Sequence, residues 1–170
     1  MRKILNGLYR GAGGLAAVFM VGTLAMVVTG VLGRLLNFNL RGTDSYAGFS
    51  MAAGFFLALA YTLNRGEHIR VTLLLQQLGP RATKAAEIIC HGIGVLLAWV
   101  LAWFSARLVW QSYTFHDVSQ GMDATPLWIP QLAMAVGTVV LAIALSDRLI
   151  LILAGRNWRA DERSDVTFSE

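Results

Sequence analysis

Four long apolar blocks constrain the fold of this chain more than any other feature. They cover residues 11–33, 45–63, 88–106 and 126–146, and His91 is the one charged or histidine residue within them. A helix of about 20 apolar residues crosses the roughly 30 Å hydrocarbon core of a membrane. A membrane β-strand would instead alternate strictly over about 10 residues, which no block does. The blocks therefore predict four transmembrane helices.

The composition supports a membrane protein. Hydrophobic residues make up 56% of the 170 residues and charged residues 14%, whereas a soluble domain has about 25% charged residues. We expect an all-α membrane protein whose single four-helix domain covers residues 1–154. Residues 155–170 are charged and polar and have no apolar residues at helical spacing, which indicates a mobile cytoplasmic tail. The expected spans are about 11–34, 45–64, 88–115 and 126–147.

Basic residues predict the orientation in the membrane. With four spans, the N-terminal segment, the second connection and the C-terminal segment share one side, and they hold eleven of the fourteen basic residues. The connection over residues 116–125 has no Lys or Arg. The positive-inside rule therefore places both termini in the cytoplasm. The eleven residues are Arg2, Lys3, Arg10, Arg65, Arg70, Arg81, Lys84, Arg148, Arg156, Arg159 and Arg163.

The second connection begins with "NRGEHIRV", residues 64–71, which carries Arg65, Glu67, His68 and Arg70. The two arginines can anchor the end of the second span near anionic headgroups, and Glu67 can pair with either. Apolar residues then follow at spacings of three and four, which predicts an amphipathic helix over about 70–78. Such a helix lies along the cytoplasmic interface or docks on another protein. Its apolar residues are Val71, Leu74, Leu75 and Leu78.

Arg107 is a charge inside the third span if that helix continues to Phe115. A charge within a membrane span is costly, so it needs a partner or access to headgroups. Its guanidinium can reach the outer headgroups. Alternatively, it pairs with Asp44, at the outer end of the second span, or with a partner subunit.

Motifs for chemistry are absent from the sequence. It shows no Gly-rich phosphate loop, no paired carboxylates and no Cys/His metal spacing, so we expect neither an enzyme nor a bound cofactor or metal, and nothing points to nucleic acid. His68 and His91 could together ligate a haem, which leaves a redox membrane anchor as one alternative. An independent small scaffold or exporter is another. No span carries the polar groups of a transport pathway, which favours an accessory subunit.

Two stretches resemble one family. In "GFFLALAYTLNRGEHIRVTLLLQQLGPR", residues 54–81, an Arg, a Gly and a His-Ile-x-Val sequence end the second span and precede an amphipathic segment. The second stretch, "ATPLWIPQLAMAVG" at residues 124–137, is similar to the family's entry into its fourth helix. In this order, on four spans, they resemble the DctQ-type small membrane subunit of tripartite ATP-independent periplasmic (TRAP) transporters.

The resemblance implies a multi-pass protein of the bacterial inner membrane. TRAP systems use an ion gradient to take up organic acids and similar solutes. A periplasmic binding protein captures the solute, and a large membrane subunit carries the solute and ion sites. The small subunit is then expected to brace the large one. Arg65, Glu67, His68 and Arg70 are expected to contact the large subunit or membrane lipids, and Arg34, Arg41 and Asp44 the binding protein.

Overall fold

The four predicted helices are present. The computed structural model describes residues 2–38, 42–64, 80–121 and 124–154, which are helical apart from turns and one isolated bridge. Each helix is long and apolar enough to cross a membrane, so the chain is a multi-pass membrane protein with four candidate spans. The helices are α1 (Arg2–Leu35), α2 (Thr43–Asn64), α4 (Pro80–Thr114) and α5 (Trp128–Leu153).

Two helices begin well before the expected spans: α1 begins at Arg2 instead of residue 11, and α4 at Pro80 instead of residue 88. The extension of α4 contains Lys84 and Glu87, which precede the apolar block but are good helix formers. Proline is well suited to the first turn, where its missing N–H leaves no intrahelical hydrogen bond unmade. The amphipathic helix expected over 70–78 and the tail over 155–170 lie outside the described residues.

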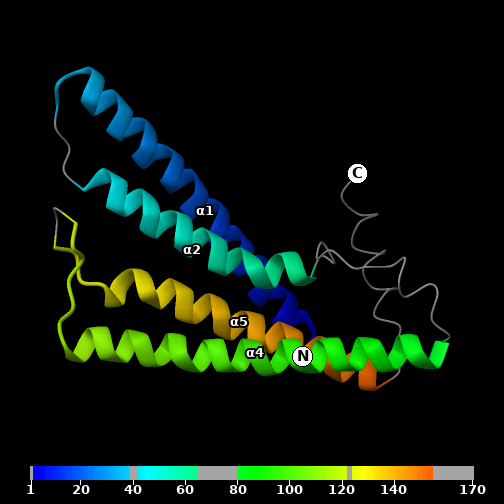
Figure 1. Cartoon of the computed structure of the whole chain (residues 1–170). Helices are drawn as coiled ribbons and strands as arrows, with labels where there is room; N and C mark the ends of the chain where they lie inside the picture. Colours follow the sequence, from blue (N-terminus) through cyan, green and yellow to red (C-terminus); the bar gives the residue numbers. More distant parts are fainter. Residues whose placement is uncertain (1, 39–41, 65–79, 122–123, 155–170) are drawn as a thin grey trace, which may run out of the picture.

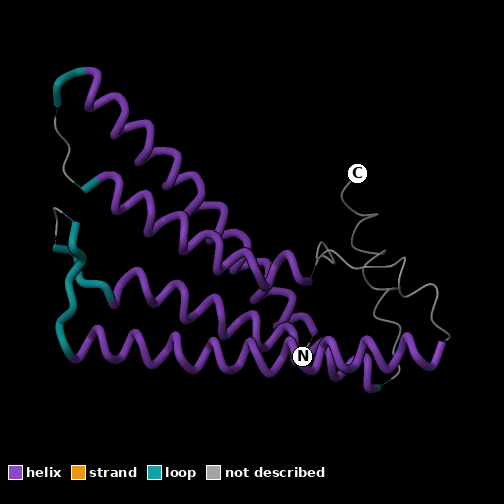
Figure 2. The backbone as a smooth tube through the Cα atoms, in the orientation of Figure 1, coloured by secondary structure: helices purple, strands orange, loops and turns teal. Residues whose placement is uncertain are grey.

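The helices form a row in the order α1, α2, α5, α4. α2 packs between α1 and α5, and α5 packs between α2 and α4. The α1–α2 hairpin diverges from the α4–α5 hairpin toward the turn that joins α1 to α2 (Figures 1 and 2). α2 and α5 are therefore the central helices of the row, and α1 and α4 are its edge helices.

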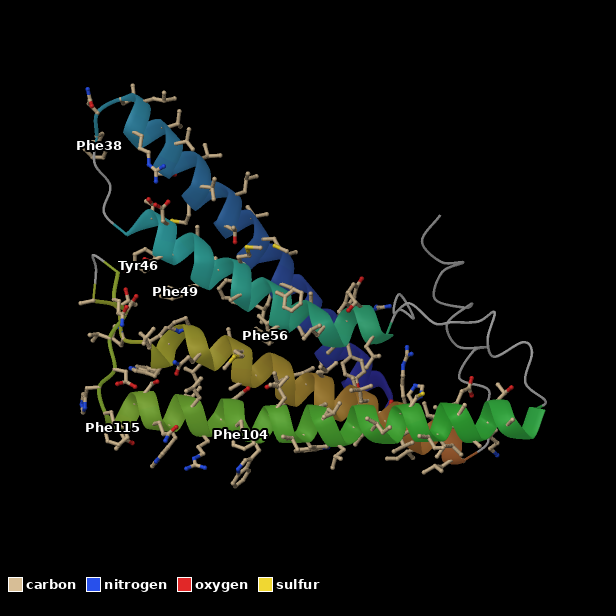
Figure 3. The ribbon with its side chains drawn as sticks, viewed as in Figure 1. Phe38, Tyr46, Phe49, Phe56, Phe104 and Phe115 are labelled. Atoms are coloured by element: carbon tan, nitrogen blue, oxygen red, sulfur yellow. The ribbon has the colours of Figure 1, made fainter. Side chains whose placement is uncertain are left out.

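Small residues line the contacts between helices, and large ones face outward. Among the described residues, ten alanines are buried, whereas leucines, valines, phenylalanines and tryptophans dominate the exposed hydrophobic residues. This arrangement suits a membrane, because lipid solvates large apolar side chains while small residues let helix backbones approach closely. A Cβ at Gly137 of α5 would lie 2.6 Å from the backbone carbonyl of Phe56 in α2. Figure 3 shows Phe56 where α2 faces α5.

Three helices converge where α1 begins and α2 ends. Tyr9 of α1, Leu63 of α2 and Val140 of α5 belong to one buried cluster, which also contains three alanines. Ala60, at the centre of the cluster, is 0% exposed. The edge helix α1 is thus held to both central helices near its first turns.

Candidate functional site

The two helical hairpins place the polar residues at opposite ends of the row. The loop end contains the α1–α2 turn and the α4–α5 loop, over residues 35–43 and 115–127. The terminal end contains the first turns of α1 and α4 and the last turns of α2 and α5 (Figure 1). Each end is a candidate contact surface for partner proteins or headgroups.

An ion pair joins the two helices of the first hairpin at the loop end. Arg34 Nη2 donates to Asp44 Oδ2 at 2.8 Å, and both side chains are largely exposed, 73% and 83%. The helices approach closely here, because a Cβ at Gly30 would lie 3.1 Å from Thr43 Oγ1. Of the three outer residues predicted to contact the binding protein, Arg34 and Asp44 are adjacent, and Arg41 lies outside the described residues.

The α4–α5 loop is tightly hydrogen-bonded. Ser119 N donates to Thr125 O at 2.8 Å, and Leu127 N donates to Asp117 O at 3.0 Å. These bonds flank an antiparallel bridge between Val118 and Pro126. These bonds hold residues 117–119 against residues 125–127, so exposed side chains there, such as Asp117, can be recognised by a partner.

Contacts with α2 join this loop to the first hairpin. Thr125 Oγ1 donates to Tyr46 Oη at 3.1 Å, and a Cβ at Gly121 would lie 2.6 Å from Ser45 Oγ. In Figure 3, Tyr46 and Phe49 lie on the side of α2 toward the α4–α5 hairpin. The loop end is thus one connected surface made from both hairpins.

The terminal end contains a buried polar group that the sequence analysis did not single out. Tyr9 is 2% exposed, and its hydroxyl has no hydrogen-bond partner among the described residues. Arg148 of α5 is also buried. No sequence pattern marks Tyr9, because its burial depends on the convergence of three helices.

The predicted cluster of Arg65, Glu67, His68 and Arg70 lies outside the described residues. Its place in the chain is nevertheless defined, since α2 ends at Asn64 and Leu63 belongs to the buried cluster at the terminal end. The end of α2 that precedes these four residues in the chain thus lies at the terminal end, opposite the Arg34–Asp44 pair.

Arg107 lies on α4 and is exposed. Arg107 does not pair with Asp44 as its position suggested, and Asp44 instead bonds Arg34 in its own hairpin. Arg107 makes no hydrogen bond or ion pair with a described residue.

Metal and haem ligands do not gather in the described parts of the chain. No group of three or more His, Cys, Asp or Glu side chains there could hold a metal ion. His91 lies on α4 with Nδ1 2.9 Å from Glu87 O, and His116 lies at the other end of the row in the α4–α5 loop. His68 is outside the described residues.

The comparisons with known proteins identify the family. Residues 23–155 match the family model described as tripartite ATP-independent periplasmic transporters, DctQ component. No curated protein and no solved structure matches the chain. The match covers most of the chain, including all of α2, α4 and α5. It favours a transporter subunit over a redox anchor or an independent scaffold. The chain belongs to the DctQ family and is the small, non-enzymatic membrane subunit of a TRAP transporter.

Proposed function

We propose that this subunit is a static brace for the large, ion-coupled permease subunit. In this role it supports uptake of an organic acid or similar solute that a periplasmic binding protein delivers. One observation carries the proposal: six serine and threonine hydroxyls along the helices bond the backbone of their own helix instead of facing a shared polar path. A carrier needs polar groups that converge on a solute site within the membrane.

These local bonds occur in every helix of the row. Each hydroxyl donates to a carbonyl three or four residues earlier, at 2.7–3.2 Å, which satisfies it without a ligand. Thr138, which is fully buried at the centre of α5, bonds Ala135 O in this way. The others are Thr23, Thr29, Thr62, Thr114 and Ser146.

The brace is tested by separating assembly from transport. The permease subunit expressed without this chain should be recovered in low yield and transport little, and co-expression should restore both. Gly92→Ala, which adds a methyl where no other atom lies within 4 Å, is a control that should assemble normally. Full uptake by the permease and binding protein without this chain would contradict the proposal.

We place the terminal end in the cytoplasm. Eleven of the fourteen basic residues belong to segments that begin or end there, as the positive-inside rule requires. The loop end then faces the periplasm. Reporter proteins fused after residue 170 and inserted between residues 120 and 121 should report opposite sides. Exposure of both fusions on one side would contradict the four-span topology.

At the cytoplasmic end, Arg65, Glu67, His68 and Arg70 orient an interfacial helix over residues 70–78 against the large subunit or lipid headgroups. Replacement of Arg65 and His68 by Ala should lower the amount of permease that co-purifies with this chain. Arg10→Ala is the matched control, because Arg10 is an exposed arginine on α1 near the same end. Unchanged assembly and uptake in the double variant would remove this role.

At the periplasmic end, Arg34, Arg41 and Asp44 form part of the docking surface for the binding protein. Arg34→Glu together with Arg41→Glu should raise the binding-protein concentration needed for half-maximal uptake. Exchanging Arg34 and Asp44 retains both charges and their pairing, so this control should leave uptake closer to normal. Equal uptake kinetics for the charge-reversed and original chains would exclude the surface.

A further inference from the structure

A positive charge lies on the side of α4 that faces away from the other helices. α4 packs along α5, and its buried residues include Ala98 and Ala102. Arg107 follows Ala98 by about two and a half helical turns, which places it on the opposite side of the helix. Figure 3 shows side chains that project from this outer side of α4. Arg107 is therefore directed toward whatever surrounds the row in the membrane.

Two tryptophans flank Arg107 on the same face. Trp103 precedes it by four residues and Trp110 follows it by three, which makes both its neighbours on a helix surface. Each tryptophan is 71% exposed. Arg107 lies about 10 Å along the helix axis from Thr114, where α4 ends. Tryptophan rings favour the boundary between hydrocarbon and headgroups. The stripe that Trp103, Arg107 and Trp110 form on α4 therefore borders the headgroups at the loop end.

The stripe has the chemistry of a phosphate site. An arginine in a membrane span requires an anion or polar partner, and none of the described residues supplies one to Arg107. The planar guanidinium can donate two parallel hydrogen bonds to one phosphate, and each indole adds an N–H donor. We propose that Trp103, Arg107 and Trp110 bind the phosphate of a phospholipid headgroup in the leaflet at the loop end.

The neighbouring residues favour a lipid over a helix of the permease subunit. Where helices of this chain meet, alanine is the commonest buried residue and glycine lies at the closest approach of α2 and α5, as close packing in a membrane requires. The outer side of α4 instead presents large side chains beside the stripe, including Val100 at 45% and Phe104 at 58% exposure. Phospholipid can adapt to such a surface. The inference requires that the helices span a membrane, and it does not depend on the bracing role.

Photo-crosslinking in the assembled transporter tests the site. A photoreactive amino acid replaces Gln111, which is exposed one turn beyond Arg107, and the complex is placed in nanodiscs of phosphatidylethanolamine and phosphatidylglycerol. We expect crosslinks to phospholipid that fall about tenfold in Arg107→Gln, because a charged hydrogen bond contributes about that factor or more. Arg10→Gln, which changes an exposed arginine on α1, should leave them unchanged.

Two results would overturn the proposal. One is crosslinking mainly to the permease subunit, which would make the stripe a protein interface. The other is equal phospholipid crosslinking with and without Arg107. If Arg107→Gln prevents assembly, Arg107→Lys replaces it, because lysine keeps the charge but lacks the planar guanidinium. We then expect phospholipid crosslinking to fall about threefold. If the bracing role is wrong, the permease subunit will assemble without this chain. If the phospholipid site is wrong, the complex will assemble but the crosslinks will not depend on Arg107, so the two proposals fail in different ways.

Discussion

The central helices and the edge helices of the row use the same residue types differently. We compare the buried share of the most apolar 18-residue segment of each helix. It is 33% in α5 and 28% in α2, but only 17% in α4 and 11% in α1. Gly137 in α5 lies against the Phe56 carbonyl of α2. A Cβ added at Gly92 in α4 would instead meet no neighbouring side chain or helix within 4 Å. Glycine therefore permits close packing between the two central helices at Gly137, and it lies on open surface at Gly92 of an edge helix.

This difference separates the residues that hold the row together from those available to its surroundings. In a membrane, helices associate through close packing, because lipid is as apolar as the side chains. The stability of the protein should then be sensitive to volume added in the helix contacts of α2 and α5. The edges should tolerate it until a partner or a lipid is displaced.

The largest effect is expected at Ala60, where α1, α2 and α5 converge. Ala60→Leu adds volume at a fully buried site and should lower the free energy of unfolding by about 3 kcal/mol. Ala52→Leu is the matched control, since Ala52 is exposed on the same helix. Thermal denaturation in mild detergent measures both variants. Equal melting temperatures would show that the convergence is not tightly packed.

The next largest effect is expected where α5 packs on α2. Gly137→Ala in this contact and Gly92→Ala on the surface of α4 should change stability in opposite directions. A methyl at Gly137 would meet the Phe56 backbone at 2.6 Å, and the resulting shift should cost about 2 kcal/mol. The methyl at Gly92 meets nothing, and alanine is the better helix former by up to about 1 kcal/mol. Stabilisation by both changes would mean that α2 and α5 do not approach closely at Gly137.

A smaller effect is expected where the edge helix α4 bonds the central helix α5. Trp99 Nε1 donates to Ser146 Oγ at 3.1 Å, and such bonds between membrane helices contribute about 0.6 kcal/mol. Trp99→Phe should therefore lower the free energy of unfolding slightly more than Trp103→Phe. A double-mutant cycle with Ser146→Ala isolates the bond, and a coupling energy of zero would show that it contributes nothing.

The smallest effect is expected at the Arg34–Asp44 pair. Both side chains are largely exposed, and exposed ion pairs contribute at most about 1 kcal/mol because water and salt screen them. Asp44→Asn should lower the melting temperature only slightly at low salt and not at 0.5 M NaCl. A large loss of stability that persists in salt would mean that the pair is shielded from solvent, for instance by a partner.

The sequence alone predicted the helices and the division of charge between their ends. Four apolar blocks without Lys, Arg, Asp or Glu could satisfy their backbone hydrogen bonds in a membrane only as helices or as a closed barrel. None of them alternates as a barrel strand does. The stretches over residues 54–81 and 124–137 also carried the family resemblance that the match over residues 23–155 confirmed. These features are local, so the order of residues along the chain was enough to reveal them.

Only the tertiary structure decided which residues meet. Asp44 pairs with Arg34 and not with Arg107, and Thr125 reaches Tyr46 across 79 positions of the chain. Tyr9 is buried because α1 crosses both central helices at its start. An apolar block predicts a helix without showing which of its faces meets a neighbour. Those faces depend on where small residues of different helices allow close approach.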